Sequence, residues 1–197
     1  MFTGIVEEIA QVQWLRRTAK STQLLLTSRY GKRVKRGDSV AINGVCLTVT
    51  SHRDDQIGFE LLEETLSRSN LRDVKPGSHV NVERAMRASS RIDGHLVQGH
   101  VDCVGTVASF EQQGADHRLE ILFPPDFSHY IAFKGSICVN GVSLTVAEAG
   151  ESSLVCWIIP FTFENTNLRH LQSGETVNLE FDILAKYVER MLIRREG

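Results

Sequence analysis

The sequence lacks several features that would indicate common classes of function. Its four cysteines, at positions 46, 103, 138 and 156, show no C-x-x-C spacing, so neither a zinc site nor a disulfide framework is predicted. No apolar run reaches 18 residues and the N-terminus has no signal-peptide pattern, so neither a membrane span nor export is expected. A reducing, cytoplasmic setting is the default for such a chain.

An excess of charge of one sign is also absent. The net charge of −2, from 22 basic and 24 acidic residues, argues against a nucleic-acid or anionic-membrane partner attracted by bulk charge. The basic run at residues 32–36 has no aromatic residues within it and is interpreted as a solvated loop. Neither a G-x-G-x-x-G nor a G-x-x-x-x-G-K-[ST] fingerprint is present, and no H-E-x-x-H spacing indicates a metal.

What the sequence does contain is an internal repeat. Residues 42–50 (Ile-Asn-Gly-Val-Cys-Leu-Thr-Val-Thr) recur, with small changes, at residues 139–147. The same offset of 97 residues aligns 39–85 with 136–182 without a gap, and 15 of these 47 pairs are identical. Chance would give about three identities at average residue usage. The chain therefore consists of two copies of one fold unit.

Short apolar runs separated by turns predict an all-β protein. Asn43-Gly44 lies between the runs 40–42 and 45–49, and both residues tolerate the positive φ of a type I′ hairpin turn. Each copy holds about six strands, which suits a small closed barrel. Thr65 and Thr162 are expected to cap short helices. Further strands are expected at residues 1–6, 23–27, 57–62 and 80–83, and in the second copy at 154–159 and 177–181.

We therefore predict two homologous, six-stranded antiparallel β-barrels in residues 1–88 and 89–183, whose boundary falls in the polar segment 84–94. Residues 184–197 break the repeat. Leu184, Val188, Met191 and Arg195 follow a 4-3-4 spacing that predicts one amphipathic helix. An isolated helix this short is marginal in water, so it needs either a barrel or other copies of itself as a partner.

Comparison of the two copies identifies candidate site residues. In each copy a Cys or Ser and a Thr lie two positions apart on one strand face. This row of polar groups either lines a pocket or is part of the packing of the barrel. For Cys46, a small buried hydrophobe is favoured over a reactive thiol. His95 and His100 are equally candidates for core or edge histidines, and Lys134 for a solvated loop charge. Asp182 is more unusual, because a carboxylate is seldom buried unpaired in a strand. The matched pairs are Cys46/Ser143, Thr48/Thr145, Thr65/Thr162, Ile5/His100 and Ala85/Asp182.

Three stretches together resemble a known family over nearly the whole chain. They are residues 1–7 (Met-Phe-Thr-Gly-Ile-Val-Glu), the two N-G-V-[CS]-L-T-V hairpins and residues 94–100 (Gly-His-Leu-Val-Gln-Gly-His), and the family is riboflavin synthase. The resemblance implies two Greek-key barrels and a homotrimer joined by the C-terminal helices. It implies dismutation of two 6,7-dimethyl-8-ribityllumazine molecules into riboflavin and 5-amino-6-ribitylamino-uracil, a transferase reaction that uses no metal and no redox cofactor.

The resemblance also implies the site residues. Two lumazines would bind per site, between the N-terminal barrel of one subunit and the C-terminal barrel of its neighbour. The N-barrel pocket would comprise Gly4, Ile5, Val6, Cys46, Leu47, Thr48, Glu60, Leu61, Leu62, Glu63, Glu64 and Thr65. The C-barrel pocket would comprise Gly99, His100, Val101, Lys134, Ser143, Leu144, Thr145, Ile158, Ile159, Pro160, Phe161, Thr162 and Phe163.

The chemistry requires removal of a proton from the C7 methyl of the donor and addition at C7 of the acceptor. His100 is the candidate base, because its pKa lies near working pH. Ser143 or Cys46 would add at the acceptor or orient water toward it, and Thr145 and Asp182 would serve polar groups nearby. The rival readings are a non-catalytic lumazine-binding antenna protein and a structural barrel adaptor. Association with lumazine synthase, the enzyme that makes the substrate, is left open by the sequence.

Overall fold

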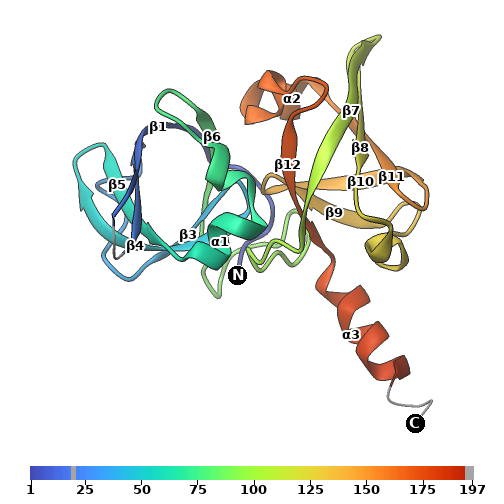
Figure 1. Cartoon of the computed structure of the whole chain (residues 1–197), viewed down its shortest axis with the longest axis horizontal. Coiled ribbons are helices and arrows are strands. Elements are labelled where there is room, and N and C mark those ends of the chain that lie inside the picture. Colours follow the sequence, from blue (N-terminus) through green and yellow to red (C-terminus); the bar gives the residue numbers. More distant parts are fainter. Residues whose placement is uncertain (19–20, 194–197) are drawn as a thin grey trace.

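The protein consists of two β-barrels that lie side by side, with the N-terminus between them and a helix projecting from the second barrel (Figure 1). The structure, a computed structural model, describes residues 1–18 and 21–193. The first barrel contains β1 (Glu8–Arg17), β2 (Thr22–Thr27), β3 (Ser39–Ile42), β4 (Val45–Arg53), β5 (Gln56–Leu61) and β6 (His79–Arg84). The second contains β7 (Cys103–Gln113), β8 (Asp116–Leu122), β9 (Ser136–Val139), β10 (Val142–Ala149), β11 (Ser153–Ile158) and β12 (Thr176–Phe181).

Both barrels are closed and have the same strand order, β1-β2-β5-β4-β3-β6 and β7-β8-β11-β10-β9-β12. In the first, β3, β4 and β5 are hairpin neighbours, and β2 lies beside β5 after a long connection, which is a Greek key. Closure removes the exposed sheet edges that would invite pairing with other chains. The predicted fold of two homologous six-stranded antiparallel barrels is confirmed.

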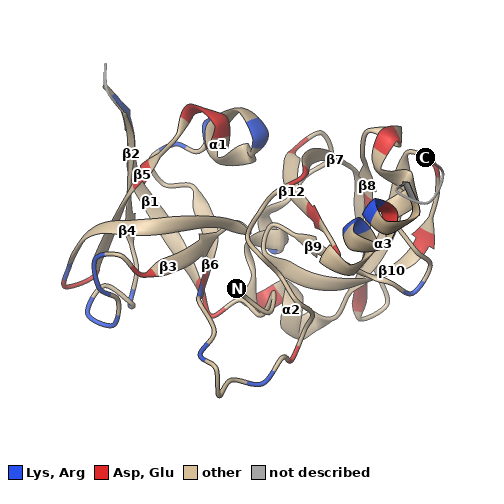
Figure 2. Ribbon diagram, turned by 90° about the horizontal axis from the view of Figure 1, so that it is seen from below, with Lys and Arg blue, Asp and Glu red and all other residues tan. Residues whose placement is uncertain are grey.

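Alternation of side chains along each strand explains where the two cores lie. Val45, Leu47 and Val49 of β4 point into the first core, while Cys46 and Thr48 face outward. Strand β10 repeats this pattern, and its apolar residues belong to a separate core inside the second barrel. Both signs of charge are distributed over the outside of both barrels (Figure 2). The outward row on β4 and β10 is therefore available to a site.

Two local predictions are wrong. Residues 1–6 form no strand: Phe2 makes only an isolated bridge with Val97, because Gly4 has φ of +76° and cannot continue a β-ladder. Thr65 and Thr162 do not cap helices. The chain leaves its strand earlier than expected, so the helices α1 (Glu63–Arg68) and α2 (Pro160–Asn165) begin before these residues and contain them.

Each barrel is completed by short helical turns. The 3₁₀ turn η1 (Asn70–Asp73) follows α1, and η3 (Asn167–His170) follows α2 at the matching place in the second barrel. A further 3₁₀ turn, η2 (Pro125–Tyr130), precedes β9. Glu63 and Thr65 of α1 line a cavity of the first barrel, and α2 occupies the matching place in the second.

The two barrels meet at their Asn-Gly hairpin turns. Gly44 and Gly141 approach so closely that a Cβ on either would lie 2.8 Å from the backbone nitrogen of the other. Asn43 and Asn140, both with φ of 47°, complete the type I′ turns that the sequence predicts. Six buried asparagines form hydrogen bonds across the interface, each with asparagines of the other barrel. They occupy three positions that the repeat relates by 97 residues: Asn43 and Asn140, Asn70 and Asn167, and Asn81 and Asn178.

The C-terminal helix α3 (Ile183–Ile193) follows β12 directly. Its base is anchored to the second barrel, where Lys186 Nζ lies 2.6 Å from Asp102 Oδ2 and Tyr130 donates to Glu189. The predicted helix is confirmed over this range, while Arg195 lies outside the described residues. In the described part of the chain, no helix is long and apolar enough to cross a membrane.

Candidate functional site

Two glycine segments cross between the barrels. The amide of Ser143, in the second barrel, donates a 2.8 Å hydrogen bond to the carbonyl of Gly4, which precedes the first barrel. The amide of Cys46, in the first barrel, donates a 2.8 Å bond to the carbonyl of Gly99, which precedes the second barrel. A Cβ on Gly4 or Gly99 would lie 2.7 Å or 2.6 Å from the Cβ of its partner, so only glycine fits at these crossings.

This crossing corrects the expected grouping of the site residues. Gly4, Ile5 and Val6 were expected with Cys46, but Gly4 contacts Ser143 and Val6 packs against the second core. Val101 correspondingly packs against the first core. Each hairpin strand is therefore opposed by the segment that leads into the other barrel.

The first-barrel site is a cavity of about 720 Å³ beside Cys46. Thr18, Ser21, Thr22 and Thr50 also line it and were missed by the sequence reasoning, because no motif distinguishes them from other polar strand residues. Glu64 is exposed and forms an ion pair with Arg68 instead. Eight of the expected residues line the cavity: Cys46, Leu47, Thr48, Glu60, Leu61, Leu62, Glu63 and Thr65.

The second-barrel site is built around Ser143. His95 Nδ1 lies 2.7 Å from Ser143 Oγ, and the ring is buried with an exposed fraction of 9%. Burial lowers the pKa of His95, and the negative charge of Asp182 opposes this shift. A neutral imidazole next to a hydroxyl can accept its proton, which makes Ser143 a candidate nucleophile with His95 as its base.

His95 was not assigned to the site from the sequence, which left open whether it is a core or edge histidine. His100, the expected base, is exposed, and because it follows Gly99 it lies with the first-barrel site rather than with Ser143. The only indication for His95 in the sequence is its place in the motif 94–100. That motif contains two histidines and does not show which of them is buried.

The remaining expected residues of the second barrel differ in accessibility. Leu144 and Ile158 point into the core and are buried, whereas Thr145 lies on the outward face and is exposed. Ile159, Pro160 and Phe161 are exposed at the start of α2, and Thr162 is half-buried. The ring of Phe163 stacks on His117 at a centroid distance of 3.9 Å. The exposed groups are therefore available to a ligand, and the core residues are not.

Lys134 is exposed and has φ of +62°. Its amide donates to the carbonyl of Val146, a bond of 2.8 Å that fixes the turn before β9. The matching position in the first barrel is Gly37, with φ of +92°. A lysine in the left-handed region costs about 1–2 kcal/mol relative to an unstrained backbone, which favours a role for its ammonium group.

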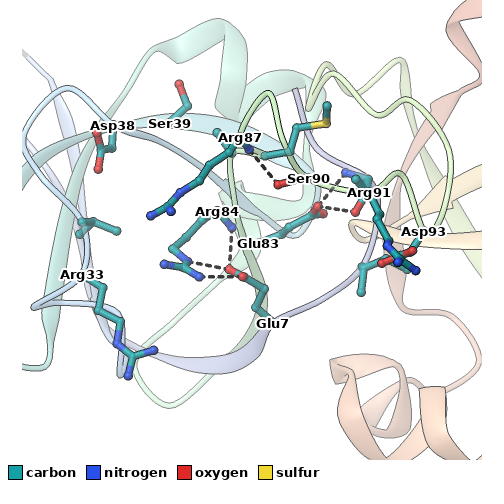
Figure 3. A pocket seen from close by; sticks show the side chains of 15 residues that line it. Glu7, Arg33, Asp38, Ser39, Glu83, Arg84, Arg87, Ser90, Arg91 and Asp93 are labelled. Atoms are coloured by element: carbon teal, nitrogen blue, oxygen red, sulfur yellow. Dashed lines mark hydrogen bonds and ion pairs between the residues drawn. The ribbon is translucent and has the colours of Figure 1, made fainter.

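A further cavity of about 560 Å³ opens between β6 and the segment that joins the barrels (Figure 3). Its wall is charged, with a paired Glu7 and Arg84 whose Oε2 and Nε atoms lie 2.9 Å apart. Glu83 extends from the same strand as Arg84 toward the N-terminal segment (Figure 3). This cavity was not predicted from the sequence.

The cysteines differ in reactivity. Burial raises the pKa of Cys103 and of Cys156 to about 12, and it raises that of Cys138 as well. Cys46 alone among the four is half-buried rather than buried. No cluster of three or more potential metal ligands occurs within residues 1–18 and 21–193. Cys46 is therefore the thiol that a reagent can reach.

The sequence is similar to a known domain family and to known enzymes. Residues 3–85 and 98–182 each match the lumazine binding domain. The chain is 39% identical to riboflavin synthase of Actinobacillus pleuropneumoniae, over 99% of this chain and 91% of that protein. It is 41% identical to riboflavin synthase of Mycobacterium tuberculosis, over 98% of each, and 36% identical to that of Bacillus subtilis, over 98% and 90%.

The fold is similar to that of solved structures of LumP. The structure of LumP complexed with 6,7-dimethyl-8-(1'-D-ribityl) lumazine superimposes with a TM-score of 0.83, covering 92% of this chain and 99% of that one at 23% identity. The complex of LumP with riboflavin gives a TM-score of 0.85 over the same shares. At this identity the likeness establishes the shared fold of two barrels.

Proposed function

The chain belongs to the riboflavin synthase family, and from this membership we propose how its two unequal sites divide the work of making riboflavin. The reaction converts two molecules of 6,7-dimethyl-8-ribityllumazine into riboflavin and 5-amino-6-ribitylamino-uracil. One lumazine gives up a four-carbon unit and the other receives it. The two products together contain all the atoms of the two substrates, so no further reactant is consumed.

Duplication of the barrel suits this chemistry, because two identical molecules must meet in one fixed pose. Each barrel would hold one lumazine, and the pose would supply several kcal/mol of the barrier by removing translational and rotational freedom. The crossing segments support this assignment. They give both sites the same construction, a hairpin strand opposed by a glycine segment from the other unit.

The two sites differ where donor and acceptor need different treatment. In the second-barrel site, Ser143 Oγ lies next to the buried His95, with the charge of Asp182 acting on the ring. We assign the acceptor to this site: His95 takes the hydroxyl proton while the oxygen adds at C7, or the pair orients a water molecule that does so. This arrangement of His95 beside Ser143 is the observation that carries the assignment.

The first-barrel site would then hold the donor. Cys46 occupies the place of Ser143 there, and His100 follows the glycine that covers it. Removal of a proton from the C7 methyl of the donor creates the nucleophilic carbon that attacks the bound acceptor. His100 and Cys46 are the groups that this chain offers for that step, and the exposed Thr48 offers a hydroxyl to the ribityl chain.

The working site would form between copies of the chain, with α3 joining three of them. Five apolar side chains of α3 are exposed although the helix base is anchored: Leu184, Tyr187, Val188, Met191 and Leu192. Packing this face against the same face of two further copies would bury it. A cytoplasmic setting and association with lumazine synthase belong to the same proposal.

Mixing the purified protein with 6,7-dimethyl-8-ribityllumazine tests the function directly. We expect riboflavin absorbance to appear with one riboflavin formed for every two lumazines consumed. A lumazine-binding antenna protein would bind the compound without turnover, and a structural adaptor would not bind it. The Ser143→Ala variant tests the acceptor site, and unchanged turnover in this variant would remove Ser143 from the mechanism.

A further inference from the structure

Two buried glutamates occupy matched positions in the closing strands of the barrels. Glu83 in β6 and Glu180 in β12 are separated by the repeat offset of 97 residues, and their exposed fractions are 6% and 3%. Neither carboxylate forms an ion pair with a described residue at 4.0 Å or less. Instead, both accept hydrogen bonds from backbone amides of the segments that cross between the barrels.

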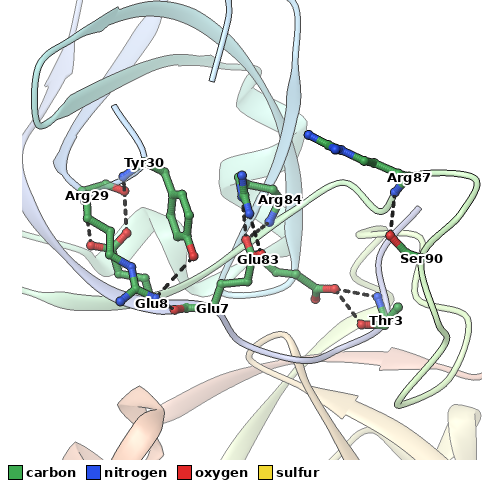
Figure 4. A network of polar contacts seen from close by, with 10 residues as sticks. Thr3, Glu7, Glu8, Arg29, Tyr30, Glu83, Arg84, Arg87 and Ser90 are labelled. Carbon is green, nitrogen blue, oxygen red and sulfur yellow. Dashed lines mark hydrogen bonds and ion pairs between the residues drawn. The ribbon is translucent and has the colours of Figure 1, made fainter. Parts of the chain in front are cut away.

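Glu83 holds the first crossing segment. Its Oε1 accepts from the amide of Thr3 at 2.7 Å and from the hydroxyl of Thr3 at 3.0 Å (Figure 4). Its Oε2 accepts from the amide of Gly4 at 3.0 Å. The carbonyl of the same Gly4 receives the amide of Ser143. One carboxylate in the first barrel thus fixes the backbone that covers the second-barrel site.

Glu180 holds the second crossing segment in the same way. Its Oε1 accepts from the amide of Gln98 at 2.6 Å, and its Oε2 accepts from the amides of Gly99 and His100, both at 2.9 Å. The carbonyl of Gly99 receives the amide of Cys46. A carboxylate in the second barrel therefore fixes the backbone that covers the first-barrel site.

A carboxylate suits this task because it accepts several hydrogen bonds and donates none. Gly4 and Gly99 have positive φ, so their segments cannot place these amides in a β-ladder, and each buried amide left unpaired would destabilise the fold. Burial nevertheless disfavours the ionised form of both glutamates, because it raises their pKa. A carboxylate kept in a place that disfavours its charge indicates a role beyond general stability.

We propose that Glu83 and Glu180 are positioning residues, each of which holds the glycine segment that completes the substrate site of the opposite barrel. Glu83 of the first barrel serves the Ser143 site, and Glu180 of the second barrel serves the Cys46 site. The proposal rests on the proposed function only in calling these sites substrate sites. The positioning itself is a property of the unliganded chain.

The crossed dependence can be measured with thiol reagents, because Gly99 covers Cys46. In the full-length protein, we expect Glu180→Gln to accelerate alkylation of Cys46 by iodoacetamide about tenfold, the factor expected for loss of one charge-assisted hydrogen bond from the covering segment. The matched Glu83→Gln variant is expected to change this rate less than about twofold. Cys46→Ser provides the baseline, since the other three thiols are buried.

A second reporter reverses the roles. In a Cys46→Ser, Ser143→Cys background, the new thiol lies under Gly4 rather than Gly99. At pH 8, above the pKa of about 7 to which burial raises Glu83, Glu83→Gln should accelerate alkylation about tenfold. Glu180→Gln should leave it nearly unchanged. A residue that only stabilised its own barrel would accelerate the reporter in that barrel, and a general loosening of the fold would accelerate both reporters with both variants. Either pattern overturns the proposal, as does the absence of any change.

Circular dichroism and urea midpoints verify that the variants are folded. Where a Gln variant does not fold, the Asp variant at the same position replaces it, because Asp keeps the charge but has a shorter reach. It too should accelerate labelling only of the reporter in the opposite barrel. Neither reporter requires lumazine. If each Gln variant accelerates labelling only in the opposite barrel but the protein makes no riboflavin, the proposed function alone is overturned. If the enzyme is active but labelling does not follow this pattern, the positioning alone is overturned.

Discussion

Nδ1 of His95 lies 2.7 Å from Oγ of Ser143, although the two residues are 48 positions apart in the chain. The contact exists because the segment that leads into the second barrel passes its hairpin strand β10. Cys46 occupies the place of Ser143 in the first barrel, and its side chain has no such histidine partner among the described residues. The two sites are therefore built alike but differ in chemistry.

Replacing His95 tests this difference. We expect His95→Gln to lower kcat by about 10²–10⁴-fold, the usual contribution of a general base, while KM changes by less than about threefold. His52→Gln, at an exposed histidine of the first barrel, is the matched control and should retain full activity. Steady-state kinetics with the lumazine measure both. Equal loss in both variants, or no loss in His95→Gln, would contradict the assignment.

The pH dependence of kcat should report the same histidine. Burial lowers the pKa of His95, so the neutral, proton-accepting ring persists below pH 6.5, and activity should fall only at more acidic pH. The charge of Asp182 stabilises the protonated ring. Asp182→Asn should therefore lower the pKa of His95 further and move the acidic limb of the pH–rate profile to lower pH. A shift of that limb to higher pH would be inconsistent with this arrangement.

Glu83 should make the stability of the protein depend on pH. Burial raises its pKa from 4.5 to about 7, so the folded state retains a proton that the unfolded chain has already lost in this range. The contribution of this group to the free energy of unfolding therefore falls as pH rises from about 4.5 to about 7. Urea titrations at pH 5 and pH 8 should show a smaller decrease for Glu83→Gln than for the unmodified protein. An identical decrease in both would refute the assignment.

Lys134 should lower the stability of the fold and strengthen the binding of lumazine. Lys134→Gly removes a side chain from a left-handed backbone and is expected to raise the free energy of unfolding by about 1 kcal/mol. The same change removes the ammonium group, so lumazine binding should weaken. Lys134→Ala separates the two effects, because it keeps the strained backbone but lacks the charge. Thermal unfolding and fluorescence titration measure them. Tight binding by both variants would show that the lysine does not contact the substrate.

The apolar face of α3 should determine the oligomeric state. Leu184 and Met191 have exposed fractions of 62% and 64% in the single chain. Replacing both with glutamate would place charge in a helix bundle, so light scattering should show a fall from three copies to one. Arg190→Glu, at an exposed site on the same helix, should keep the original mass. If the double variant also keeps it, α3 does not join the subunits.

The local sequence was sufficient to predict the architecture. Apolar alternation in β4 and β10 and the Asn-Gly turns depend only on neighbouring residues, and the 97-residue offset shows that they occur twice. Together they predict two antiparallel barrels with buried Val45, Leu47 and Val49. The helix start at Thr65 was misplaced for the same reason. A threonine accepts amides at a helix end only where the chain turns, and that place was set by how far β5 extends.

The partners of the crossing segments could be decided only by the tertiary structure. A repeat is symmetric, so the sequence is equally consistent with Gly4 lying on Cys46 or on Ser143, and the two alternatives have the same residue types and the same alternation. Contacts between residues far apart in the sequence decide between them. Val6 packs against the second core, and the Glu83 carboxylate holds Gly4 in reach of Ser143. Burial and hydrogen bonding across the interface thus determine that Gly4 pairs with Ser143 and Gly99 with Cys46, which local sequence patterns leave undetermined.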